Sequence, residues 1–264
     1  MEGEAFLRFG VFAGVFLAMA LWERTAPKRQ LLLPVSGRWT TNWAIAILDT
    51  ALVRLLFPLA AVGAALDASA QGWGLFNALG APFWLAFALS VLALDFAIWL
   101  QHLISHKVPA LWRLHQVHHA DRDLDVTTAI RFHPVEILLS MALKIGLVYA
   151  LGAPAAAVIA FEIILNGMAM FNHANVRLPK QVDAALRLVV VTPDMHRVHH
   201  SVRRAEHDAN YGFNLSIWDR LFGVYVDQPA GGHHGMRIGL EPYQGEEPAR
   251  LGWTLALPFR RMKA

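Results

Sequence analysis

The sequence predicts an all-α integral membrane protein, a helical bundle of about four to five membrane helices with a cytoplasmic histidine-rich helical cap. Three observations support this fold class. Hydrophobic residues fill 56% of the 264 positions and charged residues only 16%, whereas soluble domains carry about a quarter charged residues. Five apolar stretches approach the length of about 20 residues that a helix needs to cross a bilayer. Eight of the 13 histidines form three clusters at helical spacing.

The apolar stretches follow one another along the chain with short polar breaks. They cover approximately 5–22, 42–66, 82–100, 135–151 and 154–171. The first has an acidic start and no small-residue cleavage site, which indicates an anchor and not a signal peptide. The last two are separated by Gly152, Ala153 and Pro154, a break typical of the tip of a helical hairpin.

The distribution of Lys and Arg predicts the orientation. Of the 23 basic residues, 20 lie between the first two stretches, in 101–134, or after Phe171. The loop at 67–81 and the hairpin tip carry none. The positive-inside rule therefore places the C-terminus in the cytoplasm and every histidine on that side or just within that leaflet. We expect the chain to lie in a bacterial inner membrane.

Three regions are predicted from these patterns. Residues 1–81 are expected to form N-terminal membrane anchor helices, and residues 82–226 a histidine-rich domain that binds two metals. Residues 227–264, with Gly and Pro interspersed, indicate an irregular C-terminal tail.

Composition excludes several classes of site. The chain has no cysteine, which rules out disulfides, thiolate zinc sites, iron–sulfur clusters and cysteine nucleophiles. A net charge of +3 without a stripe of basic and aromatic residues does not indicate nucleic-acid binding. No HExxH, Walker A or GxSxG motif is present. Any metal must therefore be held by nitrogen and oxygen ligands.

The histidine clusters have the spacing of metal ligands. They are an HxxxH motif at 102–106 and HxxHH motifs at 115–119 and 196–200, with a lone histidine at 173. Residues three and four apart share one face of a helix. The nine candidate ligands are His102, His106, His115, His118, His119, His173, His196, His199 and His200. One tetrahedral zinc takes four ligands, so nine imidazoles predict two metals. Imidazole suits iron, copper, zinc and nickel, which leaves the choice of metal open at this point.

Metal-bound histidines usually donate their other ring N–H to a carboxylate or carbonyl group. Asp95 lies on the helical stripe of the first cluster and is a candidate for this role, with an ion pair to Arg54 as the alternative. Asn175, beside the lone histidine, and Asp194, before the third cluster, are further candidates.

The remaining histidines follow no ligand pattern. His133 precedes a proline and is expected to cap a helix, to contact lipid headgroups or to hydrogen-bond a metal ligand without binding the metal itself. His207 lies near the third cluster but outside its spacing, so both a ligand and a non-ligand role stay open. His233 and His234 are expected to be solvated loop residues.

The ordered set of motifs resembles the fatty acid hydroxylase/sterol desaturase superfamily. The resemblance covers roughly Phe83 to Tyr225. It rests on DFAIWLQHLISH at 95–106, PALWRLHQVHH at 109–119, RFHP at 131–134, FNHAN at 171–175, HRVHH at 196–200, NYGFN at 210–214 and WDRLFG at 218–223. Leu103 stands where many relatives have arginine. The candidate ligands are therefore intact, but a role of that arginine in contacting a headgroup or supporting a ligand does not carry over to this chain.

The resemblance implies an oxidoreductase with two iron ions, a monooxygenase or desaturase acting on a lipid C–H bond with O₂ as co-substrate. It matches the HxxxH and HxxHH motifs to eight ligands and His173 to an additional histidine near the end of the last membrane helix. Because no cytochrome-like or flavin-like segment is visible, we expect a separate electron donor, a ferredoxin-like or cytochrome-like protein with its reductase. Sterols, fatty acyl chains, sphingoid bases, ether lipids, and lipid-A-like or ornithine-lipid chains all remain open as substrates.

Two other functions are considered. A metal-ion transporter would need ligands along a path through the bilayer, whereas these histidines gather on one side. A zinc-dependent membrane hydrolase would contain a redox-inert metal and would consume no oxygen.

Overall fold

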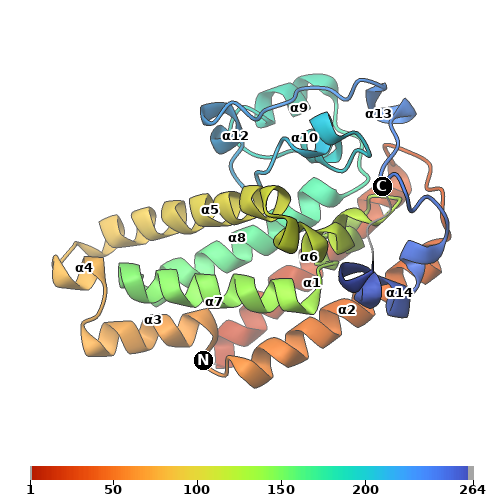
Figure 1. The fold of residues 1–264 in the computed structure, drawn as a ribbon. Coiled ribbons are helices and arrows are strands. Elements are labelled where there is room, and N and C mark those ends of the chain that lie inside the picture. The colour runs from red at the N-terminus through yellow and green to blue at the C-terminus, as the bar shows by residue number, and fades with distance from the viewer. Residues whose placement is uncertain (1, 261–264) are drawn as a thin grey trace.

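The computed structural model describes residues 2–260, and every regular element in that range is a helix (Figure 1). The long helices are α1 (Glu2–Thr25), α2 (Val35–Leu56), α3 (Ala60–Gln71), α5 (Phe83–Lys107), α7 (Pro134–Leu151) and α8 (Ala155–His173). The shorter ones are α4 (Leu75–Ala78), α6 (Pro109–His119), α9 (Lys180–Leu186), α10 (Pro193–His199), α11 (Arg204–His207), α12 (Ile217–Leu221), α13 (Gly232–Gly235) and α14 (Leu251–Ala256). Three 3₁₀ helices are η1 (Val126–Ile130), η2 (Glu247–Ala249) and η3 (Leu257–Phe259). The predicted all-α fold class is confirmed.

Five helical spans are long and apolar enough to cross a membrane, and they follow the order of the five predicted stretches. They are Phe6–Thr25, Val35–Ala78, Phe83–Lys107, Pro134–Leu151 and Ala155–His173. Large apolar side chains point outward from them, including Phe9 at 71%, Leu55 at 74% and Trp84 at 75% exposure. Apolar surface on this scale needs a cover, which a bilayer provides.

The second predicted stretch is wrong in its outline, because the chain turns inside it. α2 starts seven residues earlier than expected and ends at Leu56, and α3 begins at Ala60. Pro58 lies in the break, where it has no N–H to donate, and Ala60 has a φ of 48°. The predicted single membrane segment is therefore two helices joined by a sharp turn.

The hairpin of α7 and α8 turns at Gly152, as the Gly-Ala-Pro break predicts. Gly152 has a φ of 65° and packs against the turn before α4. A Cβ on Gly74 would lie 2.0 Å from the Gly152 backbone nitrogen, so no side chain fits between these two backbones. This contact fixes the hairpin tip against the connection between α3 and α5.

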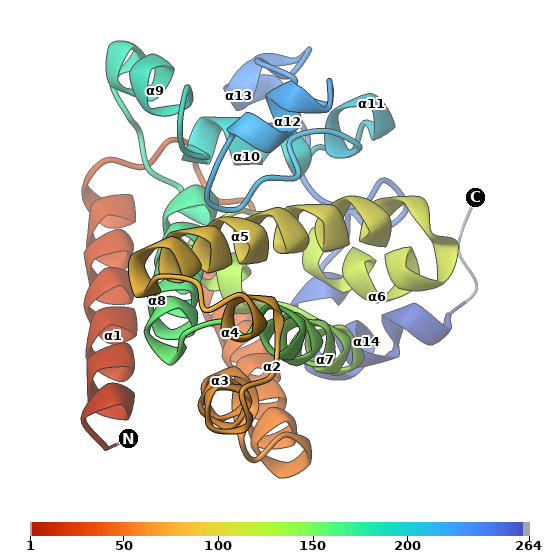
Figure 2. The same ribbon diagram turned by 90° about the vertical axis from the view of Figure 1, so that its left-hand side faces the viewer.

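α8 is the central helix of the bundle. It packs against α1, α3 and α5, and its last residue, His173, faces the cap. The cap consists of α6, η1 and α9 to α13, and Figure 2 shows α9 to α13 stacked beside α5 and the end of α8. The ends of membrane helices and the cap therefore meet where the histidines lie.

The C-terminal segment contains short helices where the sequence indicated irregular structure. α14 packs against α2, and η3 packs against α6. The apolar anchors are Leu257, which is 1% exposed, and Tyr243, which is 8% exposed. The segment is thus part of the packed molecule through residue 260.

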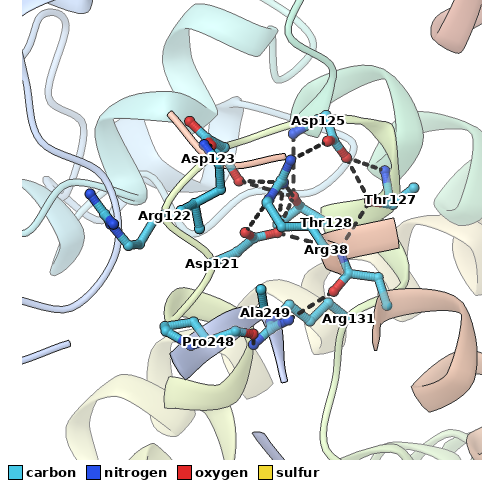
Figure 3. A network of polar contacts seen from close by, with 12 residues as sticks. Arg38, Asp121, Arg122, Asp123, Asp125, Thr127, Thr128, Arg131, Pro248 and Ala249 are labelled. Atoms are coloured by element: carbon cyan, nitrogen blue, oxygen red, sulfur yellow. Dashed lines mark hydrogen bonds and ion pairs between the residues drawn. The ribbon is translucent and has the colours of Figure 1, made fainter. Parts of the chain in front are cut away.

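The loop between α6 and α7 is held by buried ion pairs (Figure 3). Arg38 of α2 donates from Nε to Asp121 Oδ1 over 2.6 Å and from Nη1 to Asp125 Oδ2 over 2.5 Å. It also donates from Nη2 to the Asp123 carbonyl over 2.8 Å. Burial alone would raise the pKa of Asp121, but the charge of Arg38 outweighs it and lowers that pKa to about 2. The loop is therefore fixed on α2 directly after the first HxxHH motif.

Candidate dinuclear metal centre

The candidate ligands come from four helices that converge under the cap. His102 and His106 lie in the last two turns of α5, and α6 carries the first HxxHH motif. Pro109 starts α6, where its missing N–H costs nothing, and its fixed φ suits the first helical position. Thr192 caps α10 by accepting from the Met195 N–H. All nine histidines are buried, with at most 4% of each residue exposed.

The nine imidazoles divide into two groups. The five-histidine group consists of His102, His106, His115, His119 and His199. The four-histidine group consists of His118, His173, His196 and His200. Within each group, one ring nitrogen from every histidine lies within 4.8 Å of the others. The structure thus brings all nine predicted residues together, as two neighbouring sets.

Each HxxHH motif contributes to both groups, in opposite senses. In the first motif the i and i+4 histidines join the five-histidine group, and the i+3 histidine, His118, joins the other. In the second motif the i and i+4 histidines join the four-histidine group, and His199 joins the other. Positions i and i+4 differ by about 40° around a helix, whereas i+3 lies about 60° to the other side. The motif can therefore bridge two metals.

Hydrogen bonds at Nδ1 fix the tautomers. His102 and His199 donate from Nδ1 to the carbonyls of Tyr211 and Ala209, each over 2.7 Å. His173 donates to the Ala169 carbonyl over 2.7 Å, and His118 donates to a carbonyl over 3.1 Å. Since a carbonyl only accepts, each Nδ1 carries the proton and each Nε2 carries a lone pair.

The Nε2 atoms converge without protein donors, which is the arrangement that a metal ion requires. All five Nε2 atoms of the five-histidine group are buried and have no hydrogen-bond partner among the described residues. In the other group, His173 Nε2 lies 3.1 Å from His118 Nε2 and 3.0 Å from His196 Nε2. The lone pairs of His118 and His173 repel each other at this distance unless a cation lies between them. The residues therefore fit two metal ions.

Burial favours the neutral form of an imidazole, which is the form that binds metals. Burial, followed by the neighbouring histidines, holds the pKa of His119 well below its ordinary value. The same two causes lower the pKa of His200. These ligands are therefore unprotonated at neutral pH.

Two carboxylates contact the five-histidine group. Glu136 Oε1, in the first turn of α7, lies 2.6 Å from His115 Nδ1. Asp208 Oδ1 lies 3.5 Å from His106 Nδ1. In the four-histidine group, the Nδ1 contacts of His118 and His173 are to backbone carbonyls. A carboxylate partner makes an imidazole a more basic ligand, so the two groups differ electronically.

The comparison with known families rests on this same region. The family model for fatty acid hydroxylases matches residues 87–224, more than half of the chain, and includes all nine histidines. The chain belongs to the fatty acid hydroxylase family. The predicted resemblance is confirmed.

Curated relatives of this family member act on lipids according to their names. It is 29% identical over 232 residues to the ornithine lipid hydroxylase OlsE of Rhizobium tropici, covering 83% of this chain and 67% of OlsE. It is 30% identical to an alkylglycerol monooxygenase of Xenopus tropicalis over 61% of this chain and 35% of that protein. For the alkylglycerol monooxygenase of Homo sapiens the identity is 31%, over 51% of this chain and 29% of that protein. No solved structure gives a significant match.

The three residues expected to support the ligands contact other parts of this hydroxylase-family fold. Asp95 accepts a hydrogen bond from Trp218 Nε1 over 2.7 Å. Asn175 accepts from the Arg29 N–H over 3.0 Å and donates to the Arg29 carbonyl over 2.8 Å. Asp194 forms ion pairs with Lys28 and Arg197. Asp95 therefore joins α5 to α12, and Asn175 joins the segment after α8 to the loop after α1. Asp194 joins α10 to the same loop and also pairs within α10.

Glu136 and Asp208 were not singled out from the sequence. Glu136 follows His-Pro at the start of an apolar segment, and an ionisable residue in such a segment is by default a functional candidate. That signal could have identified it. Asp208 has no comparable pattern, because its contact with His106 spans about a hundred residues of sequence.

The other histidines have distinct environments. His133 caps α7 by accepting from the Val135 N–H over 3.2 Å, one of the roles expected for it. His207 lies near His106 and Asp208 at the edge of the five-histidine group, where its ring stacks on Trp112. His233 is buried and not solvated as predicted, because Arg29 holds its carbonyl against the loop after α1.

Proposed function

We propose that the chain is a membrane di-iron lipid oxygenase that hydroxylates a C–H bond of a membrane lipid with O₂ and two electrons. The observation that carries the proposal is the pair of buried, all-histidine groups at the cap ends of membrane helices. Family membership and the names of the curated relatives support the same reaction class. In such a reaction one oxygen atom enters the C–H bond, and the other leaves as water with two electrons and two protons.

Two iron ions, when bound, would activate O₂ for attack on an unactivated C–H bond. The residues of this chain would bind the ions, orient the ligands and exclude water. The nine histidines would hold the ions, and Glu136 would orient His115 through its hydrogen bond with Nδ1. Asp208 lies near His106 without hydrogen-bonding to it. The burial of every candidate ligand excludes bulk water from the reacting atoms. The sequence has no cysteine thiolate to offer as a ligand, and an all-imidazole set suits iron as well as zinc.

The position of the two groups favours a substrate that comes from the bilayer. His102, His106 and His173 are on α5 and α8, which are candidate membrane spans. A substrate chain is therefore proposed to enter from beside these helices and not across the cap. Because OlsE aligns over most of this chain, the proposed substrate class is an acyl-chain membrane lipid such as an aminolipid.

The electron donor is proposed to be a separate ferredoxin-like or cytochrome-like protein with its reductase, because the reaction consumes two electrons. The histidine groups are proposed to face the cytoplasm of a bacterial cell, on the distribution of Lys and Arg in the chain. Soluble electron carriers and reduced pyridine nucleotides are available on that side.

Metal analysis tests the proposal. Protein purified anaerobically in mild detergent should contain two irons per chain, with the Mössbauer spectrum of a dinuclear non-haem centre. His118→Ala should lose iron, whereas His234→Ala should keep it, because His234 is exposed and outside both groups. Stoichiometric zinc after expression in iron-rich medium without zinc would overturn the oxygenase. With iron present, mass spectrometry of lipids from ¹⁸O₂-grown cells identifies the product.

A further inference from the structure

The cap carries a set of apolar side chains that stay exposed within residues 2–260. We define the apolar ledge as Leu188 and Val189, which follow α9, together with Ile217, Leu221 and Phe222 at α12. These side chains are 65%, 62%, 51%, 68% and 51% exposed, in that order. None of them lies in a candidate membrane span. Exposed aliphatic and aromatic residues grouped in this way mark an interaction surface.

The ledge is a single structural unit although its two parts are distant in sequence. An antiparallel bridge joins Val190 to Leu215. The Ser216 N–H donates to the Val189 carbonyl over 3.0 Å, and Ser216 Oγ donates to the Arg187 carbonyl over 2.7 Å. The two apolar segments are therefore held at fixed relative positions.

The ledge lies against the membrane-spanning part of α5. The Phe222 ring is 4.7 Å from the Trp99 ring, and the Trp218 ring is 5.0 Å from the Phe96 ring. Figures 1 and 2 both show α12 beside the length of α5 and not beyond its end. Phe96 is at most about 20 Å along the helix from Phe83, at about 1.5 Å per residue. A hydrocarbon core about 30 Å thick extends past that point.

The apolar surface of α5 continues on both sides of this contact. Leu92 is 43% exposed and Leu100 is 37% exposed, one before and one after the residues that contact α12. The lipid-facing surface of α5 therefore adjoins the ledge.

The polar groups of the ledge have partners within the protein, as contact with lipid requires. Asp219 accepts from Trp99 Nε1 over 2.8 Å and from the backbone N–H groups of Tyr211 and Gly212 over 2.8 and 2.9 Å. The Arg220 guanidinium lies 3.9 Å over the Tyr225 ring and donates to the Arg187 carbonyl over 3.0 Å. Asp219 is therefore buried beneath the ledge, and Arg220 is exposed but satisfied by Tyr225 and the Arg187 carbonyl.

We infer that the apolar ledge is inserted among the acyl chains of the cap-side leaflet, so that the cap is itself a membrane-embedded part of the protein. The occupant of this surface is bilayer lipid, because the ledge continues the lipid-facing surface of α5 at hydrocarbon depth. It also lies close to the metal groups. Asp219 holds the Tyr211 N–H, and the Tyr211 carbonyl accepts from His102 Nδ1.

Spin labelling tests this inference directly, because the chain has no native cysteine. The single variants Leu188→Cys and Leu221→Cys would carry a nitroxide label in the metal-loaded protein, reconstituted in nanodiscs of phosphatidylethanolamine and phosphatidylglycerol. The measurement is the ratio of collision rates with O₂, which partitions into lipid, and with a water-soluble nickel chelate. Leu92→Cys on α5 is the lipid-exposed control. Arg237→Cys, whose side chain is 54% exposed on the cap, is the aqueous control.

The ledge labels should give an O₂-to-nickel ratio several-fold above that of Arg237→Cys and close to that of Leu92→Cys. A ratio equal to the aqueous control would overturn the inference. Dipolar broadening that disappears on dilution with unlabelled protein would also overturn it, because it would show a second copy of the chain on the ledge. Iron content and gel-filtration profile of each variant identify any that fails to fold, and Val189→Cys and Ile217→Cys then replace it.

Discussion

Glu136 illustrates how one side chain can distinguish two otherwise similar histidine groups. It places a buried carboxylate 2.6 Å from His115 Nδ1, and its other oxygen has no hydrogen-bond partner among the described residues. A carboxylate that accepts from a metal-bound imidazole fixes the ring and increases its basicity. The ion in the five-histidine group should therefore depend on Glu136 and the other ion should not.

Glu136→Gln is expected to lower metal affinity of the five-histidine group about 10- to 100-fold, the usual effect of losing such a partner. Iron titration of the metal-free protein would measure this, and the Mössbauer spectrum should show that one of two iron signals is affected. Asp95→Asn is the matched control, because Asp95 is also a buried carboxylate but bonds Trp218. Equal iron loss in both variants would contradict the assignment.

Asp121 is a second residue whose charge has a calculable consequence. Its folded pKa of about 2 lies below the value of about 3.9 for an unfolded aspartate. Its contribution to the free energy of unfolding is therefore complete above about pH 4 and is lost as the pH falls through about 2. Removing one partner of such a buried pair costs about 3–5 kcal/mol.

We therefore expect Asp121→Asn to lower the unfolding temperature in detergent by a constant amount between pH 7 and pH 5. Below pH 4 the difference from the unmodified chain should shrink, because Asp121 itself then becomes protonated. Asp227→Asn should have little effect, since the Asp227 side chain is 65% exposed. A difference that widens in acid would show that the Arg38 pair does not set this pKa.

Arg131 connects elements that are far apart in the sequence. Its guanidinium donates to the Val117 carbonyl over 2.9 Å, to Asn42 Oδ1 over 2.8 Å and to the Pro248 carbonyl over 2.8 Å. Its own carbonyl accepts from His118 Nδ1 over 3.1 Å. One buried residue thus ties α6, α2 and the C-terminal segment to the four-histidine group.

Arg131→Lys is expected to weaken metal binding at the four-histidine group, because an ammonium cannot reproduce the planar, multidirectional donor pattern of guanidinium. Iron stoichiometry and the Mössbauer signal of that site would report the loss. Arg113→Lys is the control. Arg113 also donates to two carbonyls of the C-terminal segment, but it is only partly buried and makes no hydrogen bond to a histidine among the described residues. Unchanged iron binding in Arg131→Lys would show that the Arg131 guanidinium is not needed to position His118.

Local spacing predicted the helices and identified the nine histidines as candidate metal ligands, because ligand motifs are repeats within single helices. It could not predict partners that the fold brings from elsewhere. The Tyr211 and Ala209 carbonyls reach His102 and His199 from an irregular segment, and Glu136 reaches His115 from the next membrane helix. It also missed the division of the second apolar stretch, where hydropathy continues across a change in backbone direction at Pro58.

At the level of the whole molecule, the helical bundle has two distinct ends. The turn near Gly74 and Gly152 forms one end, and the cap with the C-terminal segment forms the other. Basic residues gather toward the cap end, which leads to a prediction about membrane orientation.

In intact bacterial cells with a permeable outer membrane, Gly80→Cys, in the turn before α5, should react with a membrane-impermeant maleimide. Arg237→Cys should react only after the inner membrane is opened. The cysteine-free chain provides the background control. The reverse pattern would place the histidine groups in the periplasm and would contradict the positive-inside assignment.

The division of the histidines into two groups has a consequence for biogenesis. Four members of the five-histidine group are translated before the α7–α8 hairpin, but His199 follows it. The four-histidine group has only His118 before the hairpin, and its other three members end or follow it. Neither coordination sphere can be completed until the hairpin has entered the membrane and α10 has left the ribosome. Metal capture is therefore expected to be a late step of assembly, because the nascent chain exposes only partial sites.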